Sequence, residues 1–405
     1  MNSPIGFTTT KLTTLNCRAF DTTSIVTRRE AIRATGEQTP LPPELRDPMD
    51  RLLRACGVNQ GINTIDKYWK AFCDKTKFGP EYIDDHIRIP LIGDVLSNLS
   101  PDFTGLTEVW GHAASHTLCH SPYGIKAKHL KMPHYDSFRE IFSVISENSL
   151  VLSALIFTFL DPTVQFLAQS QLNQTGKTNF GRMENMMKSI EAKLIGYFEG
   201  KTFYGPGLQP LSLLDVDHWE FIPFQTMGAG FERYTQKGFV SAKVRLKDGQ
   251  WARTILTHLA VGDNVKDVEI RFSQLKEIIS HLESQTEDLP VIMMGDFNIR
   301  EGTVEYQRLK KLMQVRGFKN AYREVHPEMD IRKHYTYNDG LLHFQGKLGM
   351  ACPPGHPDEF QILDYIWVKG LRVHDARIIG PELHHSGYGG KPITDHRGVA
   401  VSVYC

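Results

Sequence analysis

The sequence predicts an α/β layered fold, in which helices cover β-sheets. Two observations predict it. Short runs of β-branched and other apolar residues, bounded by polar or turn residues, recur along the chain, and longer helical or polar segments separate them. In addition, the 405 residues are 41% hydrophobic and 23% charged, which is typical of a globular protein and excludes a disordered, collagen-like or disulfide-scaffold protein. Strands interleaved with helices are characteristic of sheets with helical outer layers.

Seven runs are predicted to be strands, because apolar and β-branched residues dominate them. They are residues 11–15, 103–109, 240–244, 253–260, 291–295, 362–368 and 399–404. Helices are predicted where apolar residues recur with the 3.6-residue period, at 87–96 and at 271–282. The second helix has one apolar face for packing on a sheet, made of Phe272, Leu275, Ile278, Ile279 and Leu282.

No internal repeat is present, and we interpret residues 1–405 as a single domain with two insertions. The first insertion, at about 35–85, contains the proline-rich stretch TPLPPELRDP, and the second is at about 121–215. Within the second, a buried strand is predicted at 151–160 and a helix with a methionine-rich side at 179–199. We interpret that side as core packing, and a surface that faces lipid or a partner is the alternative.

Charge, cysteine content and hydropathy restrict the class of protein. Lys and Arg number 46, as do Asp and Glu, and this zero net charge argues against high-affinity, non-specific binding of nucleic acid. The six cysteines form no CxxC motif, which favours reduced thiols over a zinc site or a disulfide framework. The sequence shows neither a secretory signal nor an apolar membrane span of about 20 residues. A cytoplasmic protein, or one peripheral to membranes, is expected, and any export would use a route without a cleavable signal.

Polar residues suited to catalysis or ligand binding lie next to two of the predicted strands. The strand in VIMMGDFN ends at Gly295 and presents Asp296 and Asn298 on one side, where an acid and an amide can share a charged ligand. Ahead of the last strand, ITDHRG places Asp395 beside His396, an imidazole that titrates near neutral pH. Each pattern alone is also typical of an ordinary turn.

Four further polar residues lie in or at the ends of predicted strands. Asp364 interrupts the apolar strand QILDYIWV, where a buried carboxylate is costly unless it accepts a hydrogen bond, for example from an imidazole N–H. Asn16 ends the first strand, and Glu108 in LTEVW ends a strand as an available oxygen ligand for Mg²⁺. His258 lies mid-strand in TILTHLAV, where a core histidine is the alternative interpretation.

The order of these motifs resembles that of the endonuclease/exonuclease/phosphatase superfamily. Asn16, Glu108, and then THL, GDFN, LDYI and a terminal TDH follow one another over residues 11–404. The resemblance implies a four-layer α/β/β/α sandwich of two packed mixed sheets with outer helices, as in deoxyribonuclease I, with residues 1–405 as one catalytic domain. It also implies metal-dependent hydrolysis of a phosphate ester with one or two Mg²⁺ ions, for which Mn²⁺ is a substitute.

The resemblance implies that some of these residues hold the metal and others activate water. Glu108 and Asn16 would hold Mg²⁺, and Asp395 would supply an additional contact to metal or water. His396 would activate the water, with Asp364 as its orienting carboxylate.

The remaining residues would act on the phosphate. The resemblance implies that Asp296 orients the water or protonates the leaving group, and that Asn298 binds a phosphate oxygen. His258 would stabilise charge on the phosphorus. The segment NSLVLSAL aligns with a strand of one branch of the superfamily and would put Asn148 on the phosphate side.

Within the superfamily, the sequence most resembles neutral sphingomyelinases, which are phospholipase C-type phosphodiesterases that release ceramide and phosphocholine. The shared segments are TLNC, TEVW with Trp110, QKGFV with Lys237, and THL followed by EIRFSQL with Arg271. The expected partner is a phosphodiester substrate, namely a phospholipid at a membrane surface; no pattern indicates an oligomeric state. Two alternatives stay open: a deoxyribonuclease-like endonuclease or exonuclease acting on nucleic acid, and a phosphoinositide phosphatase, which GDFNIR partly resembles.

Overall fold

The structure, a computed structural model, describes residues 8–19, 85–110, 112–132, 205–228, 232, 235–328, 330–338, 360–386 and 391–405. The chain divides into two units, and every described residue lies in the unit made of Met1–Thr23, Ile83–Tyr135 and Tyr204–Cys405. The second unit comprises Ser24–Tyr82 and Asp136–Phe203. The predicted strand at 151–160, the predicted helix at 179–199 and Asn148 all lie outside the described residues.

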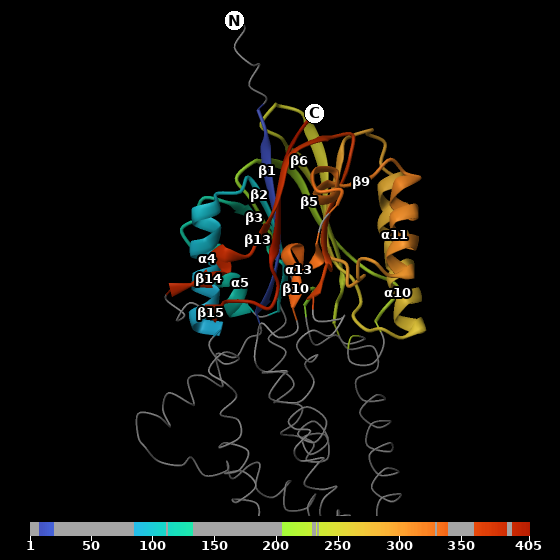
Figure 1. Cartoon of the computed structure of the whole chain (residues 1–405). Coiled ribbons are helices and arrows are strands. Elements are labelled where there is room, and N and C mark those ends of the chain that lie inside the picture. Colours follow the sequence, from blue (N-terminus) through green and yellow to red (C-terminus); the bar gives the residue numbers. More distant parts are fainter. Residues whose placement is uncertain are drawn as a thin grey trace, which may run out of the picture. The chain divides into compact units, whose positions relative to one another are not determined.

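Two six-stranded mixed sheets form the centre of the described unit (Figure 1). The first sheet has the order β13 (Arg372–Ile379), β16 (Gly398–Tyr404), β1 (Thr10–Ala19), β2 (Phe103–Val109), β4 (Gln209–Ser212) and β3 (Lys128–His129). The second has the order β5 (Asp215–Pro223), β6 (Gly238–Arg245), β7 (Trp251–His258), β8 (Val291–Asp296), β12 (Asp364–Lys369) and β9 (Lys319–Asn320). In each sheet two central strands are parallel, β1 with β2 and β7 with β8.

The two sheets pack face to face through apolar side chains that point inward from both. Leu12 and Phe103 of the first sheet share a buried cluster with Leu256 and Met294 of the second. The approach is closest at Gly105, where an added Cβ would lie 2.6 Å from Leu256 Cδ1 and 2.9 Å from Met294 Sδ. A side chain at that position would force the sheets apart, because protein interiors leave little free volume.

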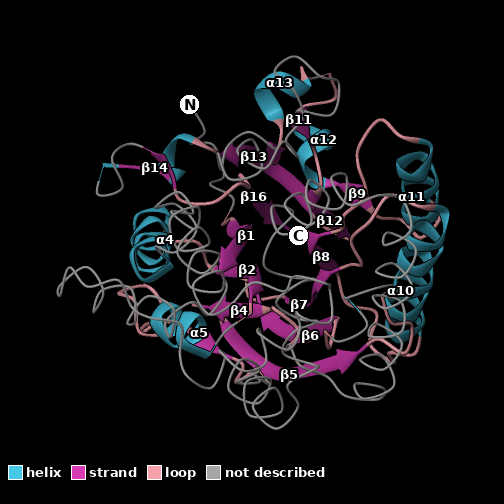
Figure 2. Ribbon diagram, turned by 90° about the horizontal axis from the view of Figure 1, so that it is seen from below, coloured by secondary structure: helices cyan, strands magenta, loops and turns pink. Residues whose placement is uncertain are grey.

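Helices cover the outer face of each sheet, which gives the four-layer α/β/β/α sandwich that the sequence predicts (Figures 1 and 2). Helices α4 (Asp85–Leu99) and α5 (His112–Cys119) bury an apolar side against the first sheet. Helices α10 (Val265–Glu283) and α11 (Val304–Gln314) do the same against the second. No described helix is long and apolar enough to cross a membrane.

Short elements complete the described unit. The helices are α12 (Ala321–Val325), α13 (Ile331–His334) and the 3-10 helix η3 (Pro381–Leu383). Two small ribbons pair β10 (Tyr337–Asn338) with β11 (Phe360–Gln361), and β14 (His384–His385) with β15 (Lys391–Pro392). Strands β3 and β4 fall within the predicted insertion at 121–215, so both ends of that segment contribute to the first sheet.

Within the described residues, the seven predicted strands occur as β1, β2, β6, β7, β8, β12 and β16, and the two predicted helices occur as α4 and α10. Three predicted placements are wrong. Asn16 does not end the first strand but lies within β1, which continues to Ala19. His258 is the last residue of β7 and does not lie mid-strand, because the parallel ladder with β8 ends at the pair His258 and Asp296. Asp364 does not interrupt its strand but begins it, opposite Asp296.

Candidate active site

The site lies at one edge of the sandwich, where four central strands end together. In the first sheet, Asn16 of β1 is in register with Thr107, the residue before Glu108. In the second sheet, His258 and Asp296 are the paired last residues of β7 and β8. Parallel neighbours end on the same edge of a sheet, so both sheets deliver polar side chains to one place.

Asn16 joins the acids of the two sheets. Its Nδ2 donates to Glu108 Oε1 at 2.9 Å and to Asp296 Oδ2 at 3.0 Å. Glu108 has a φ of 56°, a left-handed conformation that is rare outside glycine and asparagine and often occurs at functional sites. Burial, together with the neighbouring carboxylates of Asp364 and Glu108, raises the pKa of Asp296 to about 7 against the opposing effects of His396 and of the Asn298 N–H.

His396 and Asp364 form a buried hydrogen-bonded pair. His396 Nδ1 donates to Asp364 Oδ2 at 2.8 Å, which leaves Nε2 directed at Asp296, whose Oδ2 is 4.0 Å away. Burial lowers the pKa of His396, but the charges of Asp364, Asp296 and Glu108 and the hydrogen bond to Asp364 outweigh it and raise the pKa to about 9. A carboxylate on Nδ1 fixes the tautomer and the ring orientation, as in catalytic acid–base pairs.

His258 is the second histidine of the site, and it has the opposite electrostatic character. Its Nε2 lies 3.9 Å from Asp296 Oδ2, and its ring centroid is 5.8 Å from that of Trp110. Burial, followed by the charges of Lys237 and His396, lowers the pKa of His258 well below its ordinary value. His258 is therefore a neutral imidazole at pH 7, a hydrogen-bond donor that carries no net charge.

Asn298 is held beside Asp296, although not by strand geometry as predicted. The strand ends at Asp296, and Asn298 has a φ of 50° in the following loop. Its backbone N–H donates to Asp296 Oδ1 at 2.8 Å, and its Nδ2 donates to the Leu259 carbonyl at 3.0 Å. Lys237 Nζ donates to the same carbonyl at 2.7 Å, so the residue after His258 orients Asn298.

Asp395 and Thr394 complete the turn that carries His396. In the described part of the chain, metal-ligating atoms converge as Glu108, His258 and Asp296 and as Asp296, Asp364 and His396; Asp395 is buried next to them but belongs to neither group. Thr394, which the sequence analysis did not single out, donates from Oγ1 to the Asn16 carbonyl at 2.8 Å and accepts from His396 N–H at 3.3 Å. The sequence feature that could have identified Thr394 is its place in the TDH string.

The donor set fits a hard divalent cation. Ligating atoms of Glu108, His258 and Asp296 lie within 4.8 Å of one another, and two of these residues supply carboxylate oxygens. The amide of Asn16 bridges both carboxylates. Mg²⁺ prefers a few carboxylate and amide oxygens together with water, and the two carboxylates and the amide of this group can supply such oxygens.

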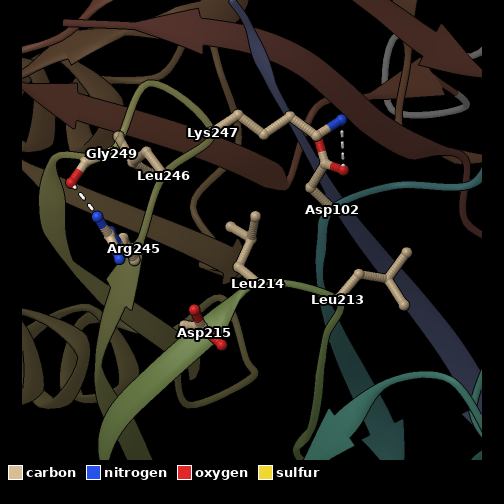
Figure 3. Close-up of a pocket in the computed structure, with 8 residues that line it drawn as sticks. All are labelled: Asp102, Leu213, Leu214, Asp215, Arg245, Leu246, Lys247 and Gly249. Atoms are coloured by element: carbon tan, nitrogen blue, oxygen red, sulfur yellow. Dashed lines mark hydrogen bonds and ion pairs between the residues drawn. The ribbon is translucent and has the colours of Figure 1, made fainter.

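A cavity of about 540 Å³ lies where β2 begins and β6 ends. Among the residues that line it are Asp102, which precedes β2, Arg245 at the end of β6, and Lys247 of the turn between β6 and β7 (Figure 3). Its charges are partnered: Lys247 Nζ is 2.8 Å from Asp102 Oδ1, and Arg245 donates to the Gly249 carbonyl. This cavity is separate from the histidine site: it adjoins the start of β2, whereas Glu108 lies near the end of that strand.

Comparisons with known proteins agree with the fold and with the predicted superfamily. Residues 215–347 match the model of the Endonuclease/Exonuclease/phosphatase family 2, which confirms the predicted resemblance to that superfamily. The structure is similar to the crystal structure of SmcL, with a TM-score of 0.50 and 14% identity over 98% of this chain and 99% of SmcL. This likeness agrees with the deoxyribonuclease I-like sandwich.

Two further solved structures are similar. One is humanized D. rerio TDP2, with a TM-score of 0.49 and 12% identity over 98% of this chain and 100% of the other. The other is sphingomyelinase C from Streptomyces griseocarneus, with a TM-score of 0.47 and 11% identity over 97% and 99%. None of the curated proteins matches the sequence.

Proposed function

We propose that this protein is a magnesium-dependent phosphodiesterase that hydrolyses a phospholipid at a membrane surface, as a sphingomyelinase or phospholipase C-type enzyme. The observation that carries the hydrolase proposal is the meeting of a buried Asp364–His396 pair with Asp296 and with the Asn16–Glu108 pair of the other sheet. An imidazole oriented by a carboxylate, next to acids that suit a cation, is the arrangement required for metal-assisted attack of water on phosphorus.

In the proposed mechanism His396 is the group that moves the proton. Its Nδ1 stays bonded to Asp364, so Nε2 is the nitrogen that accepts a proton from water. A bound divalent cation would neutralise the acids and the charge that develops on the phosphate, and would thereby lower the pKa of His396 toward neutrality.

His258 and Asn298 suit the phosphate oxygens. His258 is neutral and buried, so it donates a hydrogen bond at low cost of desolvation. Asn298 is oriented by Leu259, and the Asp296 carboxyl, which lies beside the Nε2 atoms of both histidines, suits orienting the water or protonating the leaving group.

Exposed apolar residues beside the site support a lipid substrate. Val261, three residues after His258, is 54% exposed, and Val265 and Val304 at the starts of α10 and α11 are 81% and 88% exposed. Arg271 holds these starts together, because it donates to the Gly262 carbonyl and to Glu305. Exposed apolar side chains clustered at the edge that carries the site favour contact with a bilayer.

The test offers the purified protein, with Mg²⁺ and with chelator, three substrates: short-chain sphingomyelin, plasmid DNA and a soluble phosphoinositide. We expect Mg²⁺-dependent release of phosphocholine, and none from the His396→Ala variant. Cleavage of DNA alone would overturn the lipid proposal in favour of a nuclease. Loss of phosphate from the inositide alone would identify a phosphatase, and no hydrolysis of any substrate would overturn the hydrolase proposal itself.

A further inference from the structure

The segment from Tyr335 to Asn338 lies against the turn that carries His396. The Arg397 N–H donates to the Thr336 carbonyl at 2.6 Å, and the Asn338 N–H donates to the Asp395 carbonyl at 3.4 Å. The residues on both sides of His396 are therefore bonded to this segment. In addition, the ring centroid of Tyr337 is 4.9 Å from that of His396.

The same segment holds the start of the strand that carries Asp364. The Thr336 Oγ1 accepts hydrogen bonds from the backbone N–H of Leu363 at 2.9 Å and of Asp364 at 3.1 Å. The Thr336 N–H donates to the Gln361 carbonyl at 2.9 Å. Thr336 is fully buried, so no water competes for these bonds.

We propose that Thr336 is a positioning residue that sets Asp364 and His396 in register with each other. Asp364 begins a strand of the second sheet, whereas His396 precedes a strand of the first, so the hydrogen-bonded pair spans two sheets joined by apolar packing. Packing alone tolerates small sliding, and a misplacement of about 1 Å is enough to impair catalysis. Thr336 removes that freedom, because its hydroxyl binds one partner's strand and its carbonyl binds the other partner's turn.

Threonine is chemically suited to this place. A hydroxyl oxygen has two lone pairs and can accept from two N–H groups at once, and the branched Cβ restricts the side chain to few rotamers. Serine retains the oxygen and loses only the methyl group, whereas valine retains the shape and loses the oxygen. The pair of variants Thr336→Val and Thr336→Ser therefore separates hydrogen bonding from packing.

Two measurements test the proposal. The first requires no substrate: the low-field proton NMR signal of the His396 Nδ1–H bonded to Asp364, assigned by its loss in His396→Gln, should shift or broaden in Thr336→Val and be restored in Thr336→Ser. The second rests on the proposed function: kcat on short-chain sphingomyelin should fall about 10- to 100-fold in Thr336→Val with KM within about twofold, and serine should restore it. In the Asp364→Asn background, the same Val substitution should change kcat less than about threefold, because the pair is already broken.

Thr254→Val is the matched control, because Thr254 is a buried threonine of β7 whose hydroxyl bonds only to the Ala242 carbonyl, at 3.4 Å, among the described hydrogen bonds. It should leave the NMR signal and kcat unchanged. The proposal is overturned by an unaltered His396 signal in Thr336→Val, or by an equal loss of kcat with and without Asp364. If Thr336→Val does not fold, Thr336→Ala takes its place, with the same criteria. An altered signal in a protein without hydrolase activity would overturn the proposed function and leave the positioning role standing.

Discussion

In the proposed mechanism, His396 is the residue that transfers the proton. It is buried, its Nδ1 is bonded to Asp364, and three carboxylates raise its pKa to about 9 despite burial. The raised pKa belongs to the cation-free protein, in which His396 itself compensates the acids. In the proposed mechanism, a bound cation would take over this compensation.

We expect His396→Ala to lower kcat by about 10²- to 10⁴-fold, the usual contribution of a positioned acid–base group. Turnover is measured on whichever of the three test substrates the unmodified protein hydrolyses, and circular dichroism checks that the variant is folded. His326→Ala is the control, since the His326 ring bonds to the Ala376 carbonyl and lies outside the site. Near-normal turnover in His396→Ala would remove this residue from the mechanism.

His281, which lies outside the candidate active site, makes the free energy of unfolding depend on pH. It is half-buried on α10, where burial and then the charge of Arg253 lower its pKa from 6.5. The unfolded chain thus binds a proton more readily than the folded one, and stability rises with pH between the lowered pKa and 6.5. At a pH below both the lowered pKa and 6.5, the ring is protonated in both states, and the stabilisation by the neutral ring is lost.

We expect the free energy of unfolding to fall as the pH drops below 6.5, the ordinary pKa of His281, and to fall less steeply in His281→Gln. Glutamine does not titrate and retains a hydrogen bond to Ser241, the present partner of the His281 ring. Urea unfolding at a series of pH values measures both slopes. Parallel curves for the two proteins would show that His281 is not the titrating group.

At the scale of elements, the two outer helices of the second sheet are joined by a buried ion pair. Arg271 of α10 is 1% exposed and donates from Nε and Nη2 to Glu305 of α11 at 2.7 and 2.8 Å. Its Nη1 donates to the Ala260 and Gly262 carbonyls, in the loop that follows His258. The motif EIRFSQL, which resembles sphingomyelinases, thus has a structural role in fixing a loop of the site.

We expect Glu305→Ala to lower the free energy of unfolding by about 3 kcal/mol, because it leaves a buried guanidinium without its carboxylate. Glu269→Ala is the matched control: it removes the carboxylate that pairs with Arg308 across the same two helices, where both side chains are exposed. That control should unfold at the same urea concentration as the unmodified protein. Equal effects of the two variants would contradict the buried character of the Arg271 pair.

At the scale of the whole described unit, the site joins the two sheets. Glu108 comes from the first sheet and Asp296 from the second, and the amide of Asn16 bridges their carboxylates. A cation shared by these acids would bind the folded form and not the separated strands. The predicted organisation, one catalytic domain with insertions at about 35–85 and 121–215, stays a prediction.

We expect Mg²⁺ to raise the melting temperature and EDTA to lower it. When the free concentration of a ligand is 100 times its Kd, binding to the folded state alone raises the free energy of unfolding by about 2.7 kcal/mol. Glu108→Gln should abolish the difference between Mg²⁺ and EDTA, and NaCl at equal ionic strength controls for charge screening. An equal melting temperature with and without Mg²⁺ in the unmodified protein would contradict the metal site.

The parts of the fold that the sequence predicts are the buried ones. Central strands such as β8, with every residue buried, and the amphipathic helix α10 must present apolar side chains, so their patterns are visible in the sequence. The edge strands β5 and β13 were not predicted, because most of their residues are exposed or half-exposed and backbone hydrogen bonds hold them whatever the side chain. Helix α11 was not predicted either, although its buried residues Tyr306, Leu309 and Met313 recur at helical spacing.

For the site, the sequence by itself determined which side chains are present and in which order, and that order indicated the superfamily. The family resemblance also implied the pairing of Asp364 with His396, which the structure shows as a hydrogen bond. Only the tertiary structure decided that Asn16 bridges two acids and that Thr336 connects both sheets. The physical reason is separation along the chain. Local patterns encode burial and turns, whereas contacts between residues as far apart as Asn16 and Asp296 follow from the pairing of strands and the packing of two sheets.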